Sequence, residues 1–269
     1  MTEYISHDVF NQSILPKNIT ISTMSCTCKL GTNIILQNIL DCMQLNNHDI
    51  ITIKYIGTLK SLDEKTLRKK NISKKIFFNQ LTTEVRPSEG KKINIKLFKN
   101  GSMQMTGCKS ISDINSALNR LVARLVQVKA IVEDGKIVEK KFIENEENIN
   151  ITDFKIDMIN CNYDIMFEIN REVLYNMLVE LKVECRYEPC KHACVNIKFK
   201  QHPDDEKKVS IFVFQSGKII ITGAKNDGHI ISAYKYIDAF LKEHRSKVEK
   251  KDLEKILECP EISKLLDAL

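Results

Sequence analysis

Residues 214–225 read FQSGKIIITGAK, and residues 98–109, which lie 116 positions earlier, read FKNGSMQMTGCK. Both segments place Phe, Gly, Thr, Gly and Lys at the same positions, and in both the motif is followed by an amphipathic segment with helical spacing. A solenoid has a shorter period, about 20 to 50 residues, and more copies. The repeat therefore predicts a duplicated domain with pseudo-twofold symmetry.

The same order of elements is expected in each half. The first half predicts strands at 18–28, 77–85, 93–98 and 102–106 and helices at 35–43 and 114–128, and the second half predicts strands at 154–167, 195–199, 210–214 and 219–222 and helices at 170–178 and 230–241. Helix N-caps are expected at Thr32, at Ser110 or Ser112, and at Asn170. This order predicts an α+β fold in which helices pack on one face of an antiparallel sheet.

Four regions are expected along the chain. They are a first repeat at 17–128, an acidic connector at 129–151, a second repeat at 152–245 and a helical C-terminal extension at 246–269. Within the connector, Asp134-Gly135 predicts a hairpin turn. The extension has no counterpart in the first half and is interrupted at Pro260.

Composition limits the class of protein. A net charge of +6 over 269 residues permits a polyanionic partner without demanding one. No apolar run approaches the roughly 18 residues of a membrane span, and residues 1–13 lack the pattern of a signal peptide. Nine unevenly spaced cysteines favour free thiols. We therefore expect an intracellular protein in a reducing compartment, with no membrane partner.

Enzymatic and metal-binding motifs are scarce. The sequence has no nucleophile elbow, phosphate-binding glycine loop or paired-histidine helix motif, so neither catalysis nor a cofactor is expected. Cys185, Cys190, His192 and Cys194 are a weak candidate for a zinc site. Because alternate residues of a strand point to opposite faces, we expect no metal there unless the loop is irregular.

The repeated motif resembles the signature of the TATA-box-binding proteins. That signature has Phe, Ser-Gly-Lys and Thr-Gly-Ala-Lys at fixed spacing, and residues 214–225 are similar to it throughout. Residues 154–156, 164–167 and 187–189 resemble the opening of the family's second repeat and a tripeptide before its stirrup loop, and residues 21–40 resemble the opening of the first repeat. The likeness covers most of 17–128 and 152–245, and the insertions, including one near residues 46–61, indicate a divergent branch of the sort found in large DNA viruses.

The resemblance implies a saddle, in which two pseudo-symmetric repeats form a curved antiparallel sheet with helices on its convex side. It also implies binding to the minor groove of AT-rich promoter DNA and bending by apolar wedges, for which this family is the usual example. The implied role is transcription initiation, with a B-type general transcription factor and RNA polymerase as partners. The implied location is the nucleus or a viral replication site in the host cytoplasm.

The resemblance also implies roles for particular residues. Phe78 (or Phe77), Phe98 and Phe214 match wedges, Thr106, Thr222 and Ile220 match the groove-facing floor, and Lys198, Lys218 and Lys225 match phosphate contacts. Other positions depart from the family. His192 aligns with the fourth wedge, Gln104 with an apolar floor position, Glu84 with an arginine, and Ile19 and Met158 with two base-contacting asparagines, with Asn18 and Asn160 nearby.

Alternatives remain open at this point. Phe98 and Phe214 are equally compatible with ordinary core positions, and Lys65–Lys75 is more typical of a solvated loop than of a phosphate-contacting arm. The departures favour a second function, a protein-interaction module that keeps the fold but has lost TATA binding. A nucleic-acid-binding domain for RNA or hybrid duplexes is a third.

Overall fold

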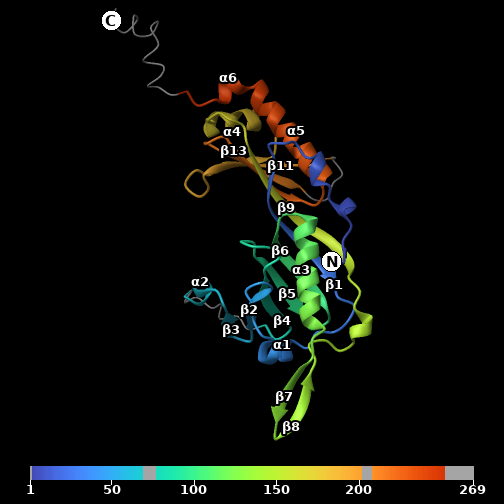
Figure 1. Cartoon of the computed structure of the whole chain (residues 1–269). Helices are drawn as coiled ribbons and strands as arrows, with labels where there is room; N and C mark the ends of the chain where they lie inside the picture. The colour runs from blue at the N-terminus through green and yellow to red at the C-terminus, as the bar shows by residue number, and fades with distance from the viewer. Residues whose placement is uncertain (1, 69–76, 202–207, 252–269) are drawn as a thin grey trace, which may run out of the picture. The chain divides into compact units, whose positions relative to one another are not determined.

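The computed structural model of the chain describes residues 2–68, 77–201 and 208–251 (Figure 1). The chain divides into two compact units. Unit 1 comprises Met1–Ile14, Ile21–Ile159 and Lys225–Asp227, and unit 2 comprises Leu15–Thr20, Asn160–Ala224 and Gly228–Leu269. Each unit contains one of the two motif turns, Gly101 in unit 1 and Gly217 in unit 2, and each unit is considered separately.

Unit 1 is built on an antiparallel sheet. Its elements are β1 (Thr20–Lys29), α1 (Leu36–Cys42), β2 (Ile50–Tyr55), β3 (Thr58–Ser61), α2 (Glu64–Leu67), β4 (Gln80–Val85), β5 (Ile93–Phe98), β6 (Ser102–Cys108), α3 (Ile111–Leu125), β7 (Lys129–Glu133), β8 (Lys136–Lys140), three short 3₁₀ turns (His7–Val9, Gln12–Ile14 and Glu146–Asn148) and the first part of β9 (Thr152–Asp164). The strand order is β9-β1-β6-β5-β4-β2-β3, and β7 and β8 form a separate hairpin.

The core of unit 1 lies between the sheet and helix α3. Along β5, Ile93, Ile95 and Leu97 are buried, while the residues between them are half-exposed. This alternation places every second side chain on one face of the sheet. Helix α3 contacts β4 and β6 and buries an apolar stripe that includes Ile114, Leu118 and Leu121. One face of the sheet is therefore the core face.

Unit 2 repeats this plan with fewer strands. It contains the end of β9, α4 (Arg171–Glu180), β10 (Cys185–Arg186), β11 (Cys194–Phe199), β12 (Val209–Phe214), β13 (Lys218–Ala224), α5 (Asp227–Glu243) and α6 (Arg245–Val248). The strand order is β10-β11-β12-β13-β9. Helix α5 buries Ile230, Ala233, Ile237 and Leu241, and the Tyr234 ring meets the buried Tyr163 ring of β9 edge to face, with centroids 4.7 Å apart.

The glycine of the repeated motif has a structural reason in both copies. Gly101 and Gly217 adopt φ values of +80° and +83°, a region that residues with a Cβ rarely occupy. A Cβ on Gly101 would also collide with the carbonyl oxygen of Thr32, and one on Gly217 with that of Phe167. The same turn closes against the same preceding loop in each unit, which confirms the duplication.

Most of the elements expected from the sequence are present. Ser110 and Asn170 cap α3 and α4, accepting hydrogen bonds from the amides of Asp113 and Val173, and the hairpin turn at Asp134-Gly135 is confirmed. The expected N-cap at Thr32 is wrong, because α1 begins at Leu36 and the Thr32 hydroxyl instead accepts a hydrogen bond from the amide of Asn145.

Two other expectations need correction or fall outside the described residues. Residues 46–61, interpreted as an insertion, contain β2, which pairs with β4 inside the sheet. Of the Lys65–Lys75 run, Lys65 lies in the one-turn helix α2, and residues 69–75 lie outside the described part. Residues 252–269, including Pro260, also lie outside it. Among the described residues, no helix is long and apolar enough to cross a membrane.

Candidate nucleic-acid interface

Each unit presents a second sheet face, formed by the side chains that alternate with the core. In unit 1, the half-exposed side chains Thr27, Thr82, Glu84, Asn94, Lys96, Phe98, Gln104 and Thr106 form what we call the first open face. In unit 2, Asn160, Asn196, Lys198, Ser210, Phe212, Phe214, Ile220 and Thr222 form the second open face. All wedge and floor residues expected from the sequence, apart from Phe78, lie on these two faces.

Strand pairing matches the two open faces position by position. The central row is Gln104–Lys96–Thr82 in unit 1 and Ile220–Phe212–Asn196 in unit 2. The next row is Thr106–Asn94–Glu84 in unit 1 and Thr222–Ser210–Lys198 in unit 2. Phe98 is the last residue of β5 and Phe214 is the last residue of β12, the middle strands of the three that form these rows. The motif residues are therefore equivalent in structure, whereas their neighbours differ.

The second open face combines apolar side chains with lysines. Phe212, Phe214 and Ile220 are half-exposed on adjacent strands. Lys198 donates to the Ser210 hydroxyl at 2.7 Å, which holds its ammonium group over the same face. Lys218, at the start of β13, is exposed, as is Lys225 just beyond the strand. This pattern suits a ligand with a flat apolar surface and an anionic border.

Asn160 also belongs to the second open face. Its side-chain carbonyl accepts a hydrogen bond from the Thr222 hydroxyl, which places an amide beside an expected groove-facing threonine. Met158, which aligns with a base-contacting asparagine, is half-exposed two residues earlier on β9. Asn18 and Ile19, which like Asn160 fall in unit 2, directly precede β1. The structure therefore places an asparagine on the open face of unit 2, shifted by two residues from the alignment.

The loop before β11, where the resemblance implies a wedge phenylalanine, borders a pocket instead. A cavity of about 300 Å³ is lined by Arg186, Glu188, His192, Cys194, Asn196 and Phe212. His192, which occupies the position of the fourth wedge, is exposed on this loop. The buried side-chain oxygen of Asn196 has no hydrogen-bond partner within the described part of the chain. On the described strands of its open face and in this loop, unit 2 thus offers one residue at an expected wedge position, Phe214, beside this pocket.

The four zinc candidates do not form a site in this loop. Among the described residues, no group of three or more His, Cys, Asp or Glu side chains lies close enough to hold a metal ion. Cys190 and His192 are exposed, whereas Cys194 is buried. Burial raises the pKa of the Cys185 and Cys194 thiols, which disfavours the thiolate that binds metals.

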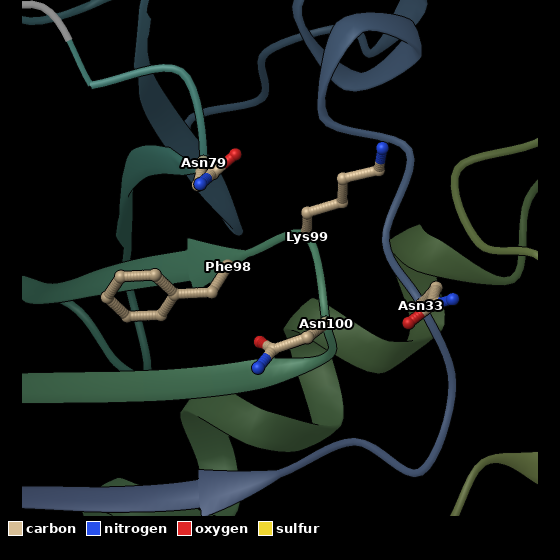
Figure 2. Close-up of a pocket in the computed structure, with 5 residues that line it drawn as sticks. All are labelled: Asn33, Asn79, Phe98, Lys99 and Asn100. Atoms are coloured by element: carbon tan, nitrogen blue, oxygen red, sulfur yellow. The ribbon is translucent and has the colours of Figure 1, made fainter.

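Phe98 lies beside a polar pocket at the end of the first open face. The cavity, of about 480 Å³, is lined by Asn33, Asn79, Phe98, Lys99 and Asn100 (Figure 2). Figure 2 shows Phe98 at the end of its strand, Lys99 and Asn100 on the turn that follows, and Asn33 on a separate segment. Phe98 also borders a cavity of about 380 Å³ that includes Gln104 and Asp153. Its ring is thus accessible from the open face.

Acidic groups distinguish the first open face. The Glu84 carboxylate accepts a hydrogen bond from the Thr52 hydroxyl at 2.9 Å. On β9, Asp153 pairs with Lys29 at 2.8 Å, and this hydrogen bond and charge lower the pKa of the Asp153 carboxyl. Asp157 accepts from the Thr27 hydroxyl at 3.4 Å. These carboxylates reduce the attraction of this face for a polyanion.

The remaining wedge candidates precede β4. The side chains of Phe77 and Phe78 are 55% and 68% exposed, which is unusual for aromatic residues. The backbone carbonyl of Phe78 accepts a hydrogen bond from the Tyr55 hydroxyl of β2 at 2.8 Å. Two aromatic side chains are therefore exposed to solvent, on a backbone that the hydrogen bond from Tyr55 fixes to β2.

Phe212 is a candidate floor residue of the second open face that the sequence analysis did not name. It is half-exposed and pairs with Ile220 across the second open face. The strict alternation of Val209, Ile211 and Val213 as buried residues places Phe212 on the same face as Phe214. The sequence contains this signal, because side chains two positions apart on a strand lie on the same face, so Phe212 lies on the face of Phe214.

Comparison with known proteins identifies the family. A family model described as transcription factor TFIID, or TATA-binding protein, matches residues 153–244. The chain is 38% identical over 266 residues to a TATA-box-binding protein-like protein of Acanthamoeba polyphaga mimivirus, an alignment that covers 92% of the chain and 71% of the relative. The chain belongs to this family of TATA-box-binding-protein-like transcription factors. The resemblance inferred from the motif, including its viral character, is confirmed.

Cellular members of the family are more distant. The chain is 31% identical over 141 residues to the TATA-box-binding protein of Dictyostelium discoideum and 26% identical over 162 residues to that of Aeropyrum pernix, and it spans 57% and 64% of their lengths. The solved structure of the Methanococcus jannaschii protein matches with a TM-score of 0.52 at 22% identity, covering 84% of this chain and 99% of that one. The α+β fold of the TATA-box-binding proteins is thereby confirmed.

Proposed function

We propose that this member of the family is a transcription initiation factor that binds AT-rich promoter DNA through the minor groove and bends it. The B-type general transcription factor and RNA polymerase would be recruited to the bent complex, at a viral replication site or in the nucleus. No covalent bond is made or broken in this role, so no catalytic group is required. The observation that carries the proposal is the second open face, with its half-exposed aromatic and aliphatic side chains and adjacent lysines.

The side chains of this face suit the chemistry of an A·T minor groove. A·T pairs present only hydrogen-bond acceptors there, so an apolar floor of Ile220 and Phe212 rejects the amino group of guanine without needing base-specific hydrogen bonds. Phe214 and, in unit 1, Phe98 and Phe78 would enter between base steps. Unstacking costs a few kcal/mol per step, which the surface buried by the bent duplex offsets. Lys198, Lys218 and Lys225 would hold phosphates.

A second candidate function is supported by unit 1. The carboxylates of Glu84, Asp153 and Asp157 on or beside the first open face suit a protein partner better than DNA. The β7–β8 hairpin extends from unit 1 and presents a cross-strand pair, Val132 and Ile137, that is 73% and 78% exposed (Figure 1). A TATA-box-binding-protein fold used only for protein interaction would keep these surfaces and lose DNA binding.

Duplex binding separates the two functions. Fluorescence anisotropy would compare an AT-rich TATA duplex with a GC-rich duplex of equal length over a series of salt concentrations, with an RNA and a hybrid duplex as further ligands. Tighter TATA binding that persists above about 150 mM salt supports groove recognition. Equal binding to all duplexes that disappears with salt reflects only counterion release, and would contradict the proposal in favour of the interaction module.

A further inference from the structure

We infer that the two halves of the DNA site follow different rules: the second open face requires A·T pairs, whereas the first open face accepts G·C pairs. The inference rests on the proposed DNA binding and defines its substrate. It follows from the position-by-position match between the two faces, which is set by strand pairing and not by the alignment of the sequence to relatives.

The minor groove allows only one chemical distinction of this kind. A·T and T·A pairs show acceptors alone, and a G·C pair adds a single donor, the 2-amino group of guanine. A protein face without acceptors leaves that donor desolvated and unpaired, which is costly. Ile220 and Phe212, paired across the centre of the second open face, carry no acceptor. The side-chain oxygen of Asn196, the third member of this row, is buried, and that of Asn160 already accepts from the Thr222 hydroxyl. This half therefore discriminates against guanine.

The same central row of unit 1 has the opposite chemistry. Gln104 stands at the ladder position of Ile220, and Lys96 at the position of Phe212. The Gln104 amide has an acceptor oxygen and two donor hydrogens, so it can pair with the guanine amino group or with the acceptors of an A·T pair. Lys96 adds donors. A face with both donors and an acceptor has no reason to exclude G·C.

Carboxylates extend the contrast beyond the central row. Glu84 lies in the row next to Gln104 and matches Lys198 of unit 2. Asp157 lies beside Thr27, whose strand neighbour is Gln104. A carboxylate only accepts hydrogen bonds, and the sole donor in the groove belongs to guanine. On A·T pairs these oxygens would face other acceptors, so the carboxylates themselves add no attraction for an A·T half-site.

Four duplexes of equal length test the inference by anisotropy at fixed salt. They carry two A·T halves, one A·T and one G·C half, two G·C halves, and the mixed design with inosine in place of guanine. Inosine lacks only the 2-amino group. We expect the mixed duplex to bind within about threefold of the A·T duplex, and the duplex with two G·C halves to bind about tenfold more weakly or worse.

Reciprocal variants assign the effect to residues. Gln104→Ile should weaken binding to the mixed duplex about tenfold relative to the A·T duplex, and inosine should restore that binding. Ile220→Gln should bring the affinity for the duplex with two G·C halves closer to the affinity for the mixed duplex. Gln37→Ile, the same exchange at an exposed position of α1, is the matched control. A thermal unfolding curve by circular dichroism that matches the parent protein shows that Gln104→Ile remains folded.

The outcomes are distinct. If the mixed duplex binds as weakly as two G·C halves, both faces exclude guanine and the inference is wrong while the proposed function stands. If Gln104→Ile leaves mixed-duplex binding unchanged, the first open face does not read the pair and the inference is also wrong. If all duplexes bind equally and only at low salt, the proposed function itself fails.

Discussion

The core faces of the two repeats match, whereas their open faces do not. At equivalent ladder positions, Ile95, Leu97, Met103 and Met105 of unit 1 correspond to Ile211, Val213, Ile219 and Ile221 of unit 2, all of them buried and apolar. On the opposite side of the same strands, glutamate corresponds to lysine, lysine to phenylalanine and glutamine to isoleucine.

The difference shows which constraint acts on which face. Packed cores tolerate changes of shape poorly, so a duplicated core keeps its chemistry even when individual residues change. The open faces carry no such packing requirement, and their chemistry changes freely with the ligand. Divergence limited to one side of a sheet therefore marks that side as the part of the molecule adapted to function.

The largest expected effect concerns the matched cores. Ile95→Ala and Ile211→Ala remove side chains that are 0% exposed, and each should lower the free energy of unfolding by about 2–5 kcal/mol. Urea unfolding followed by circular dichroism would measure this loss. Ile137→Ala, at a 78% exposed hairpin position, is the control and should change stability by less than about 0.5 kcal/mol. A loss in only one of the two core variants would break the equivalence.

The next effect concerns the two phenylalanines that end the motif strands. Phe214→Ala should weaken binding to an A·T duplex about tenfold and reduce its bend, measured by energy transfer between labelled DNA ends. Phe98→Ala should have a smaller effect, because its face carries Gln104, Lys96 and Glu84 where the other has Ile220, Phe212 and Lys198. Phe240→Ala on α5, whose ring contacts His244, is the control. Equal losses in both variants would show that the open faces act alike.

Sequence reasoning captured the features that the repeat itself encodes. The motif located β5, β6, β12 and β13, the turn glycines and the wedge candidates, because identical local geometry demanded the same residues twice. The family followed from the same residues. At the turn glycines, the backbone conformation leaves little choice of residue.

The remaining features depend on long-range pairing. Ile219, Ile220 and Ile221 are chemically identical, so the three residues by themselves do not show which one lies on an open face. The resemblance selects Ile220, and the register with β12 and the burial pattern of β13 place it there. The run Ile50-Ile51-Thr52-Ile53 is typical of a strand, but its place beside β4 is set by pairing between residues 28 to 35 positions apart. The local sequence does not indicate that pairing, so the sequence alone favours an insertion there. Thr32 resembles an N-cap because it precedes a helical segment. Its hydroxyl instead accepts a hydrogen bond from the amide of Asn145, 113 residues away, and the local sequence carries no sign of that contact.

The smallest expected effect is an exchange of charge at matched positions. Glu84→Lys should raise affinity for every duplex and steepen the dependence of log K on log salt by about one, because one more phosphate is neutralised. Lys198→Glu should do the reverse. In the first variant Thr52 keeps a partner, because its hydroxyl also lies 2.9 Å from the Ser61 hydroxyl, so the effect is not confounded by an orphaned group.

The same charge reversal on the helical side provides the control. Lys235→Glu on α5 changes the net charge equally but lies at an exposed helix position, so it should leave the slope unchanged. Opposite changes in slope for Glu84→Lys and Lys198→Glu would show that the two rows meet the same kind of ligand. A response to Lys198→Glu alone would limit phosphate contact to unit 2, and would leave the acidic first face available to a protein partner.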